Sequence, residues 1–203
     1  VNPAGRDDSR VINLAEGLAR TGRVVMIPWS GDMAAKRIVP GEVDNLVHAF
    51  EYLTGLDFVD HDRVGMAGFC VGASLAAVAA EDPRISDQVR YINFFGGYFD
   101  AADLVKSVVT RSRSYDGVVE AWAPDALAVE VVRLHLIEGL SDTADRELLV
   151  RAFLKGESVT RAEVESLSDE GTAVFDLLIG PEPDDVDEIF ERLPSAVHES
   201  LRR

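Results

Sequence analysis

Cysteine is almost absent from this 203-residue chain, which contains a single one, Cys70. One cysteine cannot form an internal disulfide, so the fold does not depend on oxidation and a reducing cytoplasm suits it. The sequence also has no run close to the roughly eighteen apolar residues of a membrane span, and no charged-then-apolar signal segment opens it. These absences predict a soluble, cytoplasmic protein.

Positive charge is scarce as well, with 20 Lys and Arg against 36 Asp and Glu and a formal net charge of -16. Such a charge repels phosphate backbones and anionic lipid head groups, so we expect neither nucleic-acid nor membrane-surface binding. There is no Cys/His cluster for zinc and no Gly-rich phosphate loop, so no metal and no cofactor is implied. Small neutral or cationic ligands remain open as partners, and the sequence does not determine the oligomeric state.

The first half of the chain alternates between two kinds of apolar pattern. Helical spacing of apolar residues and short continuous apolar runs follow one another three times. The patterns predict helices over 11–19, 42–54 and 71–80 and buried strands over 23–28, 62–68 and 89–95. This alternation is typical of an α/β fold with a parallel sheet and crossover helices.

From Ala101 onward only helical periodicity is visible, broken near Gly117, Gly139, Gly156 and Gly180. We therefore place a change of architecture near residue 100. Residues 1–100 are predicted to form an α/β core, and residues 101–203 an all-helical segment. Such a segment is either a separate bundle or a cap over a site on the sheet.

The motif with the most chemical content is Gly68-Phe69-Cys70-Val71-Gly72. It falls where a predicted strand meets a helix of small residues, and a nucleophile elbow needs glycines on both sides of a strained strand-to-helix turn. The alternative is that Cys70 is a small buried apolar residue, as free cysteines often are. Ser74 lacks flanking glycines and is interpreted as a packing residue.

At these residues the chain resembles the α/β-hydrolases, in particular the dienelactone-hydrolase-like group, whose elbow carries Cys in place of the commoner Ser. Most of the likeness lies in 62–97, and it extends back through 5–8 and 27–29 and forward to Asp100. The resemblance implies a partial hydrolase sheet followed by a helical lid. It also implies hydrolysis of ester or lactone carbonyls.

The resemblance assigns roles to individual residues. Cys70 would be the nucleophile, its thiolate favoured by the N-terminus of the following helix. The backbone N–H of Val71 would be one oxyanion-hole donor, and the second would come from the neighbourhood of Val1 and Asn2. Gly68 and Gly72 would shape the elbow.

A hydrolase of this kind also needs a His and an acid, which the family pattern places after later strands. No such strand is visible between Tyr98 and Arg203, so we expect the chain to be a fragment that lacks the first strands and the part carrying these two residues. Among the histidines only His135 and His198 are plausible substitutes, and His48 and His61 lack the family context.

Three further residues follow predicted strand ends. Asp32 and Asp100 either line a pocket or serve turn chemistry, and Trp29 either shapes an apolar substrate site or is core. Two functions are thus open. The first is a hydrolase that attacks an ester or lactone through Cys70; the second is a non-catalytic α/β-hydrolase-like domain that binds a small ligand or a protein partner.

Overall fold

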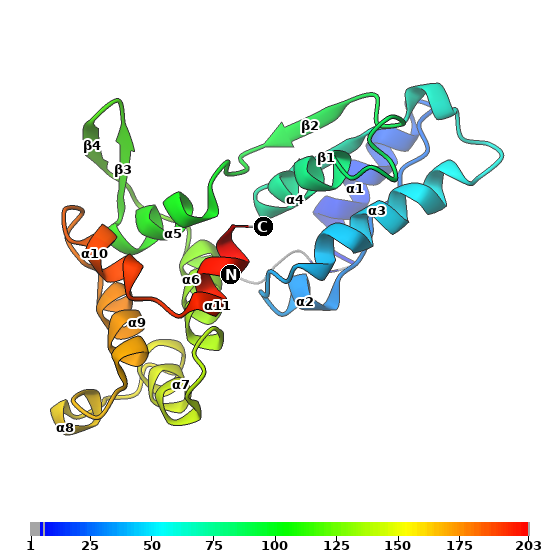
Figure 1. Cartoon of the computed structure of the whole chain (residues 1–203). Helices are drawn as coiled ribbons and strands as arrows, with labels where there is room; N and C mark the ends of the chain where they lie inside the picture. Colours follow the sequence, from blue (N-terminus) through cyan, green and yellow to red (C-terminus); the bar gives the residue numbers. More distant parts are fainter. Residues whose placement is uncertain (1–4, 6, 203) are drawn as a thin grey trace. The chain divides into compact units, whose positions relative to one another are not determined.

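The structure is a computed structural model that describes Gly5 and residues 7–202 (Figure 1). The chain is an α/β protein, and its described part divides into two compact units, one ending at Phe99 and the other beginning at Asp100. In the described ranges, no helix has both the length and the apolar character needed to cross a lipid bilayer.

The first unit contains four α-helices, one 3₁₀ turn and two strands. In chain order they are α1 (Ser9–Ala19), α2 (Gly31–Ala34), α3 (Gly41–Thr54), η1 (His61–Arg63), β1 (Met66–Phe69), α4 (Val71–Ala80) and β2 (Ile92–Phe95). The helix ends follow local chemistry. Asp8 caps α1 by accepting from the Arg10 amide at 2.9 Å, and α3 stops at Gly55.

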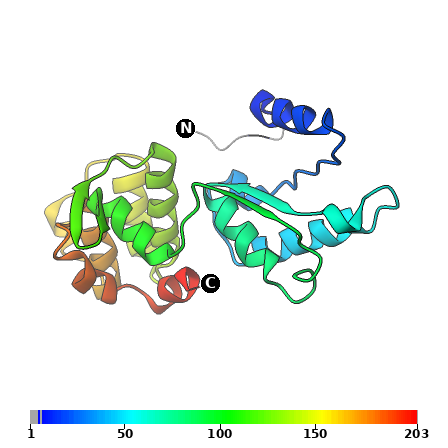
Figure 2. The ribbon, with the colours of Figure 1, turned by 90° about the horizontal axis from the view of Figure 1, so that it is seen from above.

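The centre of the first unit is a parallel pair of strands connected by a helix. β1 and β2 pair from Met66 opposite Ile92 to Phe69 opposite Phe95. Helix α4 packs on both strands and α3 packs on α4, as Figure 2 shows. The buried apolar core beneath them consists of Val47, Phe50, Val59, Val64, Ala79 and Ile85. The alternation of helix and strand therefore produces the predicted parallel pairing.

The strand predicted over 23–28 is wrong. This segment is irregular, and Val24 and Ile27 are about half exposed, at 47% and 50%. A continuous apolar run does not by itself specify a strand, because a strand also needs a partner for its backbone groups. Among the described residues, no strand pairs with this segment.

The predicted burial of the other two strands is also wrong in part. All four residues of β2 are exposed, including Phe94 and Phe95, and in β1 only Gly68 is buried. Parallel strands usually have helices on both faces. Here the described sheet has two strands, so its apolar side chains have little to pack against.

The second unit is mostly helical. Its elements are α5 (Ala101–Thr110), β3 (Ser112–Tyr115), β4 (Val118–Ala121), α6 (Ala126–Glu138), α7 (Thr143–Leu149), a π-helical turn η2 (Val150–Leu154), α8 (Arg161–Val164), α9 (Asp169–Ile179), α10 (Val186–Glu191) and α11 (Ser195–Leu201). They enclose an apolar core that includes Leu136, Ile137, Leu149, Val174, Leu177 and Val197.

The prediction that this segment is all-helical is wrong, because β3 and β4 form an antiparallel hairpin. Its turn is Asp116-Gly117, and both residues have positive φ, 51° and 80°. An Asp-Gly pair between β-branched and aromatic residues is a strong hairpin signal. Gly117 interrupts the helical periodicity of the sequence because it is the second residue of this hairpin turn.

Candidate active site at the strand-to-helix turn

Cys70 occupies the turn between β1 and α4 in an uncommon backbone conformation. Its φ is 54° and its ψ is -131°, a region that non-glycine residues rarely adopt and that costs free energy to hold. The Cys70 amide donates to the carbonyl of Phe95 at 2.8 Å, and its carbonyl accepts from the Ala73 amide at 2.9 Å. The residue is exposed, so the turn presents the thiol to solvent rather than burying it as packing.

Gly68 makes this turn sterically possible. A Cβ added there would overlap the carbonyl oxygen of Gly72 and the backbone of Ala73. Gly72 is different, because a Cβ at that position would meet nothing within 4 Å. The expectation that both glycines are needed for close packing is therefore wrong for Gly72, and the close approach depends on Gly68.

The first turn of α4 supplies backbone N–H groups beside the thiol. Val71 is the first residue of the helix, and the first amides of a helix have no partner within it. The Val71 amide therefore lies at the start of the helix that follows the turn, which is where a nucleophile elbow has its oxyanion-hole donor. The second predicted donor, Asn2, and its neighbour Val1 lie outside the described residues.

No sequence motif points to Tyr98, yet the structure places it near the thiol. Ser74 ties it to α4, since the Ser74 hydroxyl donates to the Tyr98 carbonyl at 2.8 Å and accepts from the Tyr98 amide at 2.9 Å. Burial raises the pKa of the Tyr98 phenol, and the nearby Cys70 thiol raises it further. The Tyr98 phenol is thus held in its neutral form, and Ser74 has a structural role, because it joins the backbone of Tyr98 to α4.

The histidines have separate surroundings. His48 and His61 are exposed. His135 lies in α6, and its Nε2 and the Ser200 hydroxyl of α11 are 2.9 Å apart. In the described part of the chain, no hydrogen bond joins a histidine to Cys70. His135 therefore links two helices of the second unit.

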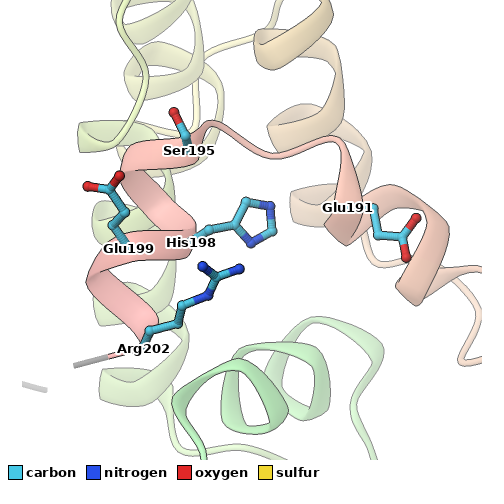
Figure 3. A pocket seen from close by; sticks show the side chains of 5 residues that line it. All are labelled: Glu191, Ser195, His198, Glu199 and Arg202. Carbon is cyan, nitrogen blue, oxygen red and sulfur yellow. The ribbon is translucent and has the colours of Figure 1, made fainter.

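His198 lines a cavity of about 360 Å³ with Glu191, Ser195, Glu199 and Arg202 (Figure 3). Its ring packs edge-on against Phe190, with 5.4 Å between ring centroids. Figure 3 shows the Ser195 side chain pointing away from the His198 ring. A serine nucleophile must hydrogen-bond its base, so Ser195 and His198 do not form a catalytic pair.

The remaining candidates have simpler roles. Asp100 caps α5 by accepting from the Asp103 amide at 3.0 Å, which is the turn chemistry weighed from the sequence. Asp32 is exposed in the first turn of α2, and Trp29 is 48% exposed, so it is not core. Across the residues placed by the structure, no group of acidic, His or Cys side chains is arranged to hold a metal ion.

Comparisons with known proteins identify no relative of this chain. No protein-family model, curated protein or solved structure matches the chain. The resemblance to the α/β-hydrolases therefore remains an expectation from the sequence.

The environment of His135 predicts a pH dependence of stability. Burial lowers the pKa of this imidazole below its ordinary value, while Glu138 opposes the shift to a smaller extent. Protonation then favours the unfolded chain. The contribution of His135 to the free energy of unfolding is complete above the ordinary His pKa of about 6.5. It is lost as the pH falls from there toward the lower pKa of His135 in the folded chain.

We expect the free energy of unfolding to fall more between about pH 7.5 and about pH 5.5 in the wild type than in a His135→Gln variant. Urea unfolding of both chains at the two pH values measures this difference. Equal losses in the two chains would show that His135 does not carry the effect.

Proposed function

We propose that this chain carries the nucleophile of a thiol hydrolase acting on ester or lactone carbonyls. The observation that supports it most is the backbone of Cys70, whose positive φ holds an exposed thiol at the N-terminus of α4. A structural cysteine gains nothing from such a strained position. A nucleophile does, because the turn lifts its sulfur out of the sheet and toward substrate.

In the proposed reaction the Cys70 thiolate attacks the carbonyl carbon and forms a C–S bond. The carbonyl oxygen becomes an oxyanion, which the Val71 amide stabilises as a hydrogen-bond donor. The C–O bond of the ester or lactone then breaks, and the leaving alkoxide takes up a proton. Water hydrolyses the thioester, releasing the acid and the thiol. The neutral phenol of Tyr98 is a donor close to these charges.

The test uses the fact that Cys70 is the only cysteine. Iodoacetamide labelling of the intact chain near pH 7 should proceed several-fold faster than labelling of glutathione, because the proposed nucleophile is exposed beside the free backbone amides at the start of α4. With p-nitrophenyl acetate we expect a burst approaching one equivalent of p-nitrophenolate per chain, as acyl transfer to a thiol produces. Cys70→Ala should abolish both signals, and Ser74→Ala should retain the burst if the chain stays folded.

Labelling no faster than that of glutathione, together with no burst, would refute the hydrolase proposal.

The alternative function is a non-catalytic α/β-hydrolase-like domain that binds a small ligand or a protein partner. One observation favours it. Phe69 and Phe95 stack with 5.1 Å between ring centroids while staying 57% and 54% exposed, so they form an apolar contact surface beside Cys70.

A further inference from the structure

The second unit contains a cavity unrelated to Cys70. Its volume is about 940 Å³, within the range of small-molecule sites. The end of the β3–β4 hairpin, helix α6 and the π-helical turn η2 form its walls. The lining side chains that matter are Arg111, Trp122, Val129, Glu130, Arg133 and Phe153.

Guanidinium groups gather at this cavity although the chain as a whole is strongly acidic. Arg111 and Arg133 line it, and Arg113 stacks on the Trp122 ring at 3.8 Å from the ring centroid. Within the described residues, no ion pair joins these three side chains to a carboxylate, whereas Arg84 and Arg151 are paired. The chain has 36 acidic residues, yet the two arginines that line the cavity and the third beside it have no carboxylate partner among the described residues. This arrangement indicates a site for an external anion, although one acidic side chain, Glu130, also lines the cavity.

The backbone around the cavity is irregular in two places. Arg111 ends α5 in the left-handed region, with φ 53° and ψ 37°, at a position where glycine is the usual residue. The turn η2 is π-helical, with the Lys155 amide donating to the Val150 carbonyl at 3.0 Å. Such turns occur frequently at functional sites. Both features carry a conformational cost at residues that line or flank the cavity.

Apolar and aromatic surface accompanies the positive charge. Trp122 and Phe153 are both half-buried, and Arg133 approaches Phe153 twice, donating to its carbonyl at 3.4 Å and lying 6.0 Å from its ring centroid. Guanidinium groups bind carboxylates through paired N–H donors, and aromatic side chains pack against planar rings. Glu130 adds one negative charge to the lining, so two arginines and one glutamate suit a monoanion better than a dianion.

We propose that this cavity binds a planar aromatic monocarboxylate, held by Arg111 and Arg133 and packed against Trp122 and Phe153. The site is distinct from the proposed thiol chemistry and does not depend on it. A Cys70→Ala chain is therefore expected to bind as the wild type does.

The first experiment is calorimetric titration of the whole chain with 2-naphthoate and with its neutral isostere 2-naphthamide. We expect 2-naphthoate to bind at least about tenfold more tightly, and Arg133→Gln to remove about that much of the affinity, as the loss of a charged hydrogen bond does. Arg161→Gln is the matched control, since Arg161 is an exposed arginine paired with Glu165. It should leave the affinity unchanged.

A second variant separates binding from folding. Arg111→Gly removes a guanidinium but relieves the left-handed backbone, so the melting temperature should hold or rise while 2-naphthoate affinity falls several-fold. Asp116→Gly is its backbone control. Asp116 also has a positive φ, 51°, but is not among the cavity-lining residues. This control should not lower the affinity.

Glu130→Gln tests the sign of the ligand charge. Removing the acidic lining group should tighten 2-naphthoate binding, because the carboxylate is then no longer repelled. Equal binding of naphthoate and naphthamide, or unchanged affinity in both Arg133→Gln and Arg111→Gly, would overturn the proposal. Weaker 2-naphthoate binding in Glu130→Gln would also overturn it, because the expected repulsion by Glu130 would then be absent.

Discussion

Replacing Gly68 by Ala is expected to lower the free energy of unfolding by at least about 3 kcal/mol, at the upper end of what overpacking costs. The reason is that the added Cβ would overlap backbone atoms of Gly72 and Ala73 rather than the end of a flexible side chain. Backbone atoms at the start of α4 can move only if the turn itself opens. Urea unfolding followed by far-UV circular dichroism measures the loss.

Gly72→Ala is the matched control, four residues along the same turn. Its added Cβ has open space within 4 Å, and Ala is the better helix former by about 1 kcal/mol in a helix interior. We expect this variant to be as stable as the wild type or slightly more stable. If both variants lost stability equally, the close approach at Gly68 would not be what shapes the elbow.

Leu177→Ala is expected to cost about 2–5 kcal/mol, because truncating a buried leucine removes apolar contacts and leaves a cavity. Leu177 is fully buried in the core of the second unit, at 0% exposure. Since it lies on α9, the loss should appear as a lower urea midpoint with unchanged helix content at zero urea.

Ile179→Ala provides the control on the same helix. Ile179 is 62% exposed, so its truncation should change stability by no more than about 0.5 kcal/mol. A cost for Leu177→Ala as small as that of Ile179→Ala would contradict the packing described for the helical core.

The sequence predicted the local features of the elbow well because they are encoded over a few neighbouring residues. The change from an apolar run to small helical residues at Cys70 places the start of α4 at Val71 and its end at Ala80, as the structure has them. Short-range steric and hydrogen-bonding preferences are enough for such features.

What the sequence did not predict depends on partners far along the chain. The apolar segment 23–28 has the composition of a strand but no strand to pair with among the described residues, and β2 is apolar yet exposed. Tyr98 comes close to Cys70 only through its pairing with Ser74, 24 residues away in the chain. The β3–β4 hairpin is different, because its turn is encoded locally by the adjacent residues Asp116 and Gly117.

The backbone of Cys70 has an evolutionary consequence. Glycine would adopt a φ of 54° without the cost that cysteine bears, but glycine has no sulfur. Selection for folding alone and selection for thiol chemistry therefore favour different residues at this position. In a laboratory population propagated only for stable expression, position 70 should drift toward glycine, whereas selection for acyl transfer should hold cysteine in place.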